Sequence, residues 1–404
     1  MLPVERGLEI VMSTAAAKAR PDWMPPEAVP LLDSMHRVLR EDVFCDADSP
    51  PFDKAIRDGF AVRFEDVAQV PAVLKVIGES RAGAGADVVV TPSECCEIMT
   101  GAPLPPGANA VVMVENTERL SADSVRILKS VRENEGLLRR GAEAREGDKI
   151  LQAGRRIGLA DLGLLASSGK SSVAVSKKPR VAVIATGDEL VEVNQEPQAG
   201  QIRNSNTYTI CAQVAEAGAQ PVVLGIARDN LDDLRNKLRQ GLDHDVLLVS
   251  GGVSMGKYDL VETVFAEFGV EVLFDKIAMK PGKPTVFGHL KNTYVFGLPG
   301  NPISTLVAFH MFVRPLLLFL LKSEDTSPKI LEAVLEASAK CDPEREAIVP
   351  AVVTFDGGKY RIRTAPWKGS SDLVGLARAN ALIMIPRRTG TLETGENVRF
   401  LPME

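Results

Sequence analysis

Apolar and polar positions alternate most regularly between residues 179 and 322. Short continuous apolar runs, typical of strands buried on both faces, are separated by segments with apolar residues every three or four positions, as on a helix face. The predicted strands are 181–185, 222–226, 246–249, 270–274, 285–287 and 294–296. The predicted helices begin near Asn206, at Asp229 or Asn230, near Val261 and at Pro302. This alternation predicts a central, doubly wound, largely parallel α/β domain, which we place at residues 179–327.

The beginning of the chain has a helical pattern. Val29, Leu32, Met35 and Leu39 are spaced by three, three and four positions, which predicts one apolar helix face. A further helix is expected at residues 158–166, returning toward the first segment. We therefore expect an elongated helical domain made of two separate segments, residues 1–49 and 132–178.

Two other sections have short β-prone runs between Gly and Pro turns. The first section, residues 50–131, is expected to form a β-rich domain with runs at 73–77, 87–90, 110–114 and 125–128. The second section, residues 328–404, is expected to form a small terminal β domain. The chain is therefore predicted to be multidomain, combining α/β, β and helical parts.

Composition and charge narrow the classes of function. The chain has 47 Lys and Arg against 53 Asp and Glu, a net charge of −6, so we expect no nucleic-acid partner. Its five cysteines include no C-x-x-C pair, which argues against a disulfide framework and a structural zinc site. The most apolar stretch, residues 303–321, contains Arg314 and Pro315, which favours a buried helix over a membrane span. We expect a cytoplasmic protein without a membrane partner.

Polar motifs follow the predicted strands of the α/β section. Ligands of open α/β sheets bind beyond the carboxyl ends of the strands, and four polar loops are predicted at that edge. Turn chemistry could explain one such loop, but four on one edge favour a binding site. The candidate residues are Thr186, Gly187, Asp188 and Glu189 in the first loop, Asp229 in the second, Ser250, Gly251, Gly252, Ser254 and Asp259 in the third, and Pro299, Gly300 and Asn301 in the fourth.

The third loop has the composition of a phosphate-binding loop. Residues 251–257 match G-x-x-x-x-G-K, but Tyr258 stands where a P-loop needs Ser or Thr for Mg²⁺. A Gly-rich loop that opens a helix can still hold phosphates through backbone N–H groups. Asp229 and Asp259 are candidates to hold a divalent cation that bridges such phosphates.

Further candidates carry positive charge or hydroxyl groups. If residues 276–280 are extended, Lys276 and Lys280 point to one face and, with Lys283, suit a polyanion; a solvated charge patch is the alternative. Three other segments indicate turns by composition alone, although they carry side chains with useful chemistry. These side chains are Asp58, Thr100, and the pair Ser370 and Ser371.

Together the motifs resemble those of a known family. In chain order they are R-D-G-F-A-V, M-T-G-A-P, A-T-G-D-E-L, S-G-G-V-S-M-G, K-P-G-K-P, L-P-G-N-P and L-A-R-A-N-A-L. This series is similar to the MoeA family of molybdopterin molybdenumtransferases, which includes the carboxyl-terminal part of gephyrin. The resemblance runs from Pro26 to the C-terminus. It implies an elongated helical domain, a β-rich domain, an α/β molybdopterin-binding domain and a terminal β barrel, in a homodimer whose active cleft lies between domains of both subunits.

The resemblance also implies a reaction in molybdenum cofactor biosynthesis. Adenylylated molybdopterin and molybdate are the implied substrates, and the adenylate is hydrolysed with Mg²⁺ so that AMP leaves and molybdenum stays on the dithiolene. The molybdopterin adenylyltransferase is a further implied partner. The family's functional side chains fall on Asp58, Thr100, Glu189, Asp229 and Asp259, and on the substrate-binding residues Lys276, Lys280 and Ser370.

The chain departs from the family pattern at several positions. Arg57 and Phe60 flank the first Asp-Gly in place of Met and Tyr, and Glu143 replaces an aspartate. The family's G-R-x-x-F-x-R signature in the last domain falls on residues 344–350, so its second arginine, implicated in holding molybdate, is Pro350 here. We therefore expect weaker molybdate binding unless another basic residue compensates. The candidates for that residue are Arg361, Arg363 and Lys368.

Two alternatives to the insertase remain open from the sequence. A molybdopterin adenylyltransferase shares the α/β domain, although the additional helical and β domains argue against it. A molybdopterin-binding or scaffolding protein that has lost activity would explain Pro350.

Overall fold

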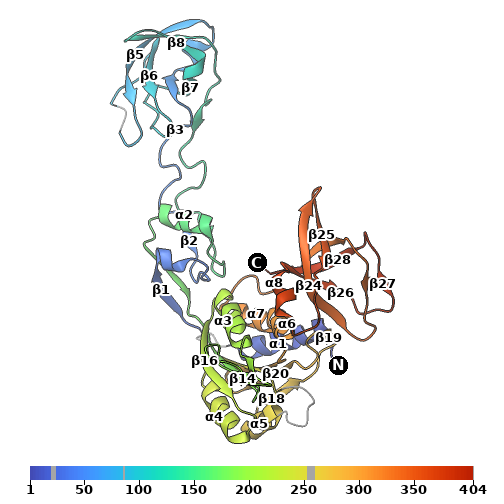
Figure 1. The fold of residues 1–404 in the computed structure, drawn as a ribbon. Helices are drawn as coiled ribbons and strands as arrows, with labels where there is room; N and C mark the ends of the chain where they lie inside the picture. Colours follow the sequence, from blue (N-terminus) through green and yellow to red (C-terminus); the bar gives the residue numbers. More distant parts are fainter. Residues whose placement is uncertain (20–23, 85–86, 253–259, 404) are drawn as a thin grey trace.

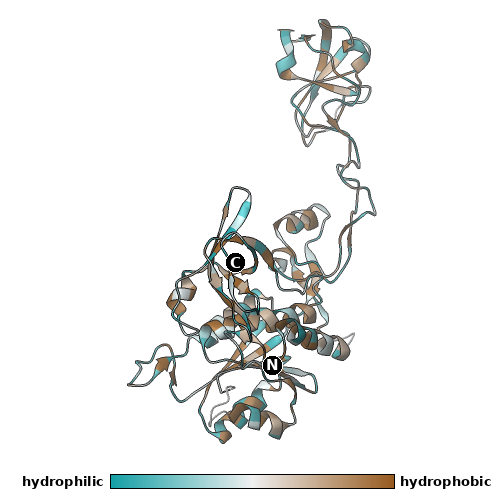
Figure 2. Cartoon of the chain, turned by 90° about the vertical axis from the view of Figure 1, so that its right-hand side faces the viewer, coloured by the Kyte–Doolittle hydropathy of each residue, from teal (hydrophilic) through white to brown (hydrophobic). Residues whose placement is uncertain are grey.

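The computed structural model describes residues 1–19, 24–84, 87–252 and 260–403. Its outline is elongated: a small β-rich part stands apart at one end, and a narrow connecting part joins it to the main body (Figure 1). Figure 2 shows apolar residues gathered in the main body and again in the distant β-rich part.

The main body is built on a six-stranded mixed sheet. The first four strands pair in parallel, and the last two are antiparallel to their neighbours. The strand order is β16 (Gln220–Ala227), β13 (Arg180–Thr186), β17 (Val246–Ser250), β21 (Thr293–Leu298), β20 (Val286–Leu290) and β18 (Glu271–Phe274). Six strands near the expected positions confirm the predicted α/β domain.

Helices cover both faces of this sheet. Along β13, Val181 and Val183 join one apolar cluster and Ala182 and Ile184 the other, because successive strand residues point to opposite faces. One face is covered by α4 (Leu231–Gly241) and α5 (Leu260–Phe268). The other is covered by α1 (Val4–Lys18), α3 (Asn206–Glu216), and the run of α6 (Pro302–Ala308), η4 (Phe309–Val313) and α7 (Arg314–Leu320).

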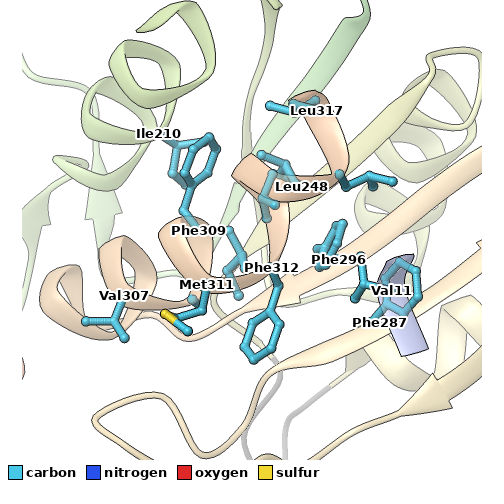
Figure 3. Packing of buried hydrophobic residues seen from close by; sticks show 14 of the residues in the cluster. Val11, Ile210, Leu248, Phe287, Phe296, Val307, Phe309, Met311, Phe312 and Leu317 are labelled. Atoms are coloured by element: carbon cyan, nitrogen blue, oxygen red, sulfur yellow. The ribbon is translucent and has the colours of Figure 1, made fainter. Parts of the chain in front are cut away.

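The run from Pro302 to Leu320 forms the centre of the larger core. By length and composition it could cross a membrane, but 78% of its most apolar window is buried inside the protein. Phe309, Phe312 and Leu317 pack there with Val11 of α1 (Figure 3). The segment is therefore a core helix, as its sequence predicted.

The C-terminal region forms a closed β barrel. Its five strands follow one another in the order β24 (Glu346–Asp356), β25 (Lys359–Thr364), β22 (Leu331–Leu335), β28 (Asn397–Pro402) and β26 (Ala381–Ile385), and β26 pairs back onto β24. Short elements beside it are β19 (Met279–Lys280), which pairs with β24, the pair β23 (Ala339–Lys340) and β27 (Thr391–Leu392), and α8 (Leu373–Ala377). Ile348, Leu382 and Leu401 of the barrel belong to the same apolar cluster as α1, α6 and α7. The barrel therefore packs on the α/β domain through one shared apolar cluster, and it has a second cluster of its own around Ile362 and Phe400.

The distant part is a second six-stranded sheet. Its strand order is β7 (Ala110–Met113), β4 (Gly59–Val62), β6 (Glu94–Ile98), β5 (Ala72–Ser80), β9 (Ser124–Ile127) and β8 (Thr117–Ser121), with short turns η2 (Phe64–Val67) and η3 (Val114–Asn116). The strand predicted at residues 87–90 is wrong, because Val90 donates its N–H to the loop carbonyl of Pro106 at 2.8 Å instead of joining the sheet. The two apolar clusters of this part contain only residues between 55 and 137.

The connecting part is mixed rather than helical. One helix, α2 (Leu159–Ser167), lies close to its prediction. The other elements are η1 (Leu31–Ser34) and the strand pairs β1 (Pro26–Pro30) with β12 (Ser172–Ser176), β2 (Val43–Phe44) with β11 (Lys149–Leu151), and β3 (Lys54–Ala55) with β10 (Leu137–Leu138). In the α/β domain, β14 (Leu190–Val191) pairs with β15 (Ile202–Arg203).

The helix predicted through Val29 and Leu39 is wrong. Val29 lies in β1, and Leu32, the next residue of the supposed apolar face, is 84% exposed. Pro26 and Pro30 explain the error, because proline removes a backbone donor and pushes the residue before it out of the helical region. The helix of this end of the chain is α1, which packs on the α/β domain through Val4, Val11 and Ala15.

Candidate functional site

A cavity of about 990 Å³ lies where the parallel strands of the α/β sheet end. One wall comes from loops after β13, β16, β17 and β21, and the other from segments beside the barrel. Most of the residues predicted from the sequence line it. They are Thr186, Gly187, Glu189, Asp229, Ser250, Gly251, Gly252, Lys280, Lys283, Pro299, Gly300, Asn301, Ser370 and Ser371.

The remaining predicted residues lie elsewhere. Ser254 and Asp259 fall outside the described residues. Asp188 lies beside the cavity without lining it. Lys276 does not line the cavity and forms an ion pair with the neighbouring Asp275 at 3.2 Å. The extended segment predicted for residues 276–280 is limited to β19, so the expected pairing of two lysines on one strand face is wrong.

The floor of the cavity requires glycine at two consecutive positions. Gly251 and Gly252 have φ values of +98° and +65°, in the left-handed region that favours glycine. A Cβ atom on either residue would lie 2.9 or 2.8 Å from the Thr186 hydroxyl. The Thr186 side chain thus occupies the space that larger residues would need, and the backbone of the Gly-rich loop can approach it closely.

The end of the cavity formed by the α/β loops is predominantly acidic, with the carboxylates of Glu189 and Asp229 beside the cationic Arg203. Asp188 and Asp229 form two reciprocal hydrogen bonds. The Asp188 backbone N–H donates to the Asp229 carboxylate at 3.3 Å, and the Asp229 backbone N–H donates to the Asp188 carboxylate at 3.2 Å. The Glu189 carboxylate folds back over Gly187, where a Cβ atom would lie 2.3 Å from it. Within the described ranges no group of three or more His, Cys, Asp or Glu side chains could hold a metal alone. The exposed Asp229 nevertheless suits Mg²⁺, which is usually held by one or two carboxylates together with substrate phosphates.

The other end of the cavity carries positive charge. Lys280 and Arg345 both contact Asp342, at 3.4 and 3.2 Å, so one carboxylate orients two cationic side chains. Backbone N–H donation from Glu344, followed by the charge of Arg345, holds the pKa of Asp342 below its ordinary value. The Arg345 Nε is buried, and no hydrogen-bond partner for it is found in the described part of the chain. A tetrahedral dianion would meet several cationic donors here.

Arg345 was missed by sequence reasoning. The basic residues expected to replace the family arginine, Arg361, Arg363 and Lys368, do not line the cavity. Pro350 itself is buried in the barrel, where it pairs with Leu382 across β24 and β26. The signal was present in the first arginine of the same signature, five residues before Pro350.

The hydroxyl groups at this end come from the loop before α8. Asn301 donates its side-chain N–H to the Ser370 hydroxyl at 2.9 Å, and Ile303 N–H donates to the Ser370 carbonyl at 3.0 Å. Asp372 caps α8 by accepting from Gly375 N–H at 2.9 Å. Trp367, another residue that the sequence did not single out, lines the cavity and packs against both the α/β and the barrel cores.

Asp58 and Thr100 form a separate pair in the β-rich part. Thr100 donates both its backbone N–H and its hydroxyl to Asp58, at 2.7 and 2.8 Å. These bonds, the backbone one first, hold the pKa of Asp58 below its ordinary value. Both residues lie outside the cavity lining, and the β-rich part stands far from the main body (Figure 1). One chain alone therefore does not bring this pair to the cavity.

Fold and cavity define a multidomain protein with a ligand-binding α/β domain whose cleft is shared with a β barrel. Family models agree along the chain: the MoeA N-terminal region (domain I and II) matches residues 2–169, a probable molybdopterin binding domain matches residues 182–318, and the MoeA C-terminal region (domain IV) matches residues 332–403.

Individual relatives agree with these models. The molybdopterin molybdenumtransferase of Bacillus subtilis is 37% identical over 383 residues, 93% of this chain and 89% of the relative. That of Staphylococcus aureus strain COL is 33% identical and covers all of this chain and 96% of the relative. A crystal structure of a molybdopterin biosynthesis MoeA protein from Pyrococcus horikoshii OT3 matches with a TM-score of 0.83 and 27% identity over the full length of both chains. The chain therefore belongs to the MoeA family of molybdopterin molybdenumtransferases, enzymes of molybdenum cofactor biosynthesis.

Proposed function

We propose that this enzyme inserts molybdenum from molybdate into adenylylated molybdopterin and releases AMP. The observation that carries the proposal is the polarity of the cavity, with strand-end loops and carboxylates at one end and cationic and hydroxyl groups at the other. A substrate with phosphates and a dithiolene, together with a small oxyanion, requires both chemistries within one cleft. A volume of about 990 Å³ is of the size found for ligand sites.

At the acidic end, the Gly251–Gly252 backbone and the Thr186 hydroxyl are proposed to contact the phosphates. Asp229, with Asp259 beyond the described residues, would hold Mg²⁺. When bound, this ion would neutralise charge that develops on the phosphate oxygens during adenylate hydrolysis. Glu189 and Asp229 are proposed to orient the attacking water, which is consistent with their exposure toward the cleft.

At the cationic end, Lys280, Lys283 and Arg345 are proposed to hold molybdate, with Ser370 and Ser371 donating hydroxyl hydrogen bonds. Charge-assisted hydrogen bonds are stronger than neutral ones and suit a tetrahedral dianion. Arg345 would compensate for Pro350, so we propose that molybdate binding is retained. Lys276 is not included among these molybdate ligands, because it pairs with Asp275 and does not line the cavity.

We further propose a homodimer in which Asp58 and Thr100 of one copy complete the cavity of the other. Their distance from the cavity within one chain supports this arrangement. We also propose that the enzyme is cytoplasmic. It would form a transient complex with the molybdopterin adenylyltransferase, which would supply the adenylylated substrate.

The test is to incubate the purified protein with adenylylated molybdopterin, Mg²⁺ and molybdate. AMP release together with molybdenum transfer is the expected result. Adenylate formation from ATP would instead indicate the adenylyltransferase, and tight binding without turnover would indicate a scaffold. The family relationship favours neither alternative.

A further inference from the structure

One buried amide in the cavity wall contacts three separate segments of the chain. Asn206, at the start of α3, is nine-tenths buried and lines the cavity. Its side-chain nitrogen lies 2.9 Å from the Ser250 hydroxyl, 2.7 Å from the Gly300 carbonyl and 3.4 Å from the Thr305 hydroxyl. The side chain therefore joins the end of β17 to the loop before α6.

The orientation of this amide follows from its partners. A backbone carbonyl can only accept, so the nitrogen of Asn206 must face Gly300. The amide oxygen is buried, and no partner for it is found in the described part of the chain. A buried polar atom without a partner destabilises the fold. The reason for an asparagine at this position therefore lies in the hydrogen bonds that its side-chain nitrogen donates, since its side-chain oxygen forms none in the described part of the chain.

The hydrogen bonds continue from this amide to the barrel side. Asn301 follows Gly300 and donates to the Ser370 hydroxyl at 2.9 Å, and the Ser370 carbonyl accepts from Ile303 N–H at 3.0 Å. In the direction of the Gly-rich loop, Ser250 is followed in the chain by Gly251, whose backbone N–H donates to the Leu298 carbonyl at 3.0 Å. A continuous path thus runs from the Gly-rich loop to the serine loop.

We propose that Asn206 is a positioning residue. Through this path of hydrogen bonds, a hydrogen-bond relay, it fixes the two ends of the cavity relative to each other. The proposal rests on the proposed function, because it takes the Gly-rich loop as the phosphate end and the Ser370 loop as the oxyanion end. Asn206 acts through Ser250 and Gly300, whereas Asn301 acts only on the oxyanion end. Loss of Asn206 should therefore weaken both ligands, and loss of Asn301 only one.

The experiment uses the full chain and two simple probes, AMP and sodium molybdate, with dissociation constants measured by calorimetry. Asn206→Asp keeps the size of the side chain but places a carboxylate oxygen against the Gly300 carbonyl. We expect it to raise both constants about tenfold, the effect of one net hydrogen bond. Asn301→Ala should raise only the molybdate constant, by a similar factor. Because the links act in series, the double variant should bind molybdate no more weakly than Asn206→Asp alone.

The matched control is Asn230→Ala, which removes a helix-capping asparagine at the start of α4. Among the residues that the structure describes, its side chain accepts from Asp233 N–H, at 2.9 Å. Its melting temperature should fall while both dissociation constants stay within about twofold. A purely structural role of Asn206 predicts the same behaviour for Asn206→Asp, and that result would overturn the proposal.

Hydrogen exchange of the ligand-free protein gives a second readout. Asn206→Asp should speed exchange at Gly251 and at Ile303, the amide that donates to Ser370, while Asn230→Ala leaves both unchanged. Unaltered exchange at Ile303 would contradict the relay. A wild-type protein that binds neither AMP nor molybdate would contradict the proposed function instead, and the exchange data would still decide on the relay.

Discussion

The barrel and the β-rich part are both β domains, but they relate to the α/β domain in opposite ways. Barrel residues such as Leu382 and Leu401 lie in one apolar cluster with Phe312 and Leu317 of the central helices. The β-rich part has its own two clusters, confined to residues between 55 and 137.

This difference separates two kinds of site residue. The Ser370 loop and Arg345 belong to the part that shares an apolar cluster with the α/β domain, so the two walls of the cavity are fixed relative to each other. Asp58 and Thr100 belong to the independent part. A shared core positions groups within one chain, whereas groups on an independent domain need the connecting part or a second copy to position them.

The largest expected effect concerns stability. Leu317→Ala and Leu74→Ala each remove a buried leucine, one from the shared core and one from the β-rich part. Each should lower the free energy of unfolding of its own unit by about 2–5 kcal/mol. Trp367 packs against both the α/β and barrel cores, so its fluorescence in a Trp23→Phe background reports on that unit.

Only Leu317→Ala should shift the Trp367 transition to lower denaturant. An equal shift caused by Leu74→Ala would show that the β-rich part unfolds with the main body, which would remove the distinction between the two β domains.

The next effect concerns the oxyanion end. Arg345→Ala should weaken molybdate use about 10- to 150-fold, because a charge-assisted hydrogen bond contributes roughly 1.5–3 kcal/mol. The measurement is molybdate-dependent turnover at fixed adenylylated substrate. Arg361→Ala is the control, since Arg361 pairs with Asp356 at 3.4 Å away from the cavity. Equal molybdate-dependent turnover of the two variants would show that Arg345 does not bind molybdate.

A smaller but more specific signal tests whether the independent domain serves a second copy. Asp58→Asn and Lys280→Ala should each lose about nine-tenths or more of wild-type turnover alone at limiting molybdate, the lysine variant through the loss of one charge-assisted hydrogen bond. An equal mixture that exchanges subunits should recover about a quarter of wild-type turnover, because half of the dimers are mixed and each has one intact site. No recovery, in a mixture shown by mass spectrometry to contain mixed dimers, would contradict a cavity completed across subunits.

The smallest expected effect is the pH dependence of the Asp58 pair. Thr100→Val removes the hydroxyl donor and keeps the backbone donor, so the pKa of Asp58 should rise part of the way toward its ordinary value. A lowered folded pKa gives stability that is present above the unfolded pKa, about 3.9, and is lost as pH falls through the folded value.

The variant should therefore be less stable than wild type at neutral pH and equal to it in strong acid. An NMR titration of Asp58 measures the shift directly. Thr91→Val, which removes a donor to Glu94 in the same domain, should leave the Asp58 titration unchanged.

Local sequence patterns were enough to predict the α/β domain and most of the cavity lining. Continuous apolar runs and helical periodicity are local properties, and strand-end loops gather at one edge because parallel strands share a direction. For this reason the sequence alone predicts that Thr186, Asp229, Gly251 and Asn301 lie together, and all four line the cavity. The same local reasoning failed at Val29 and Leu32, where prolines overrode an apparent helical spacing.

Which charged side chains reach the cavity depends on contacts between distant parts of the chain. Lys276 and Lys280 are equivalent in sequence, but Asp275 pairs with the first and Asp342 orients the second together with Arg345. Barrel closure and the shared core bring residue 345 to the loops of the α/β sheet, whereas Asp58 stays on a domain with its own core. Such contacts join residues far apart in the chain, and no local pattern of apolar and polar positions specifies them.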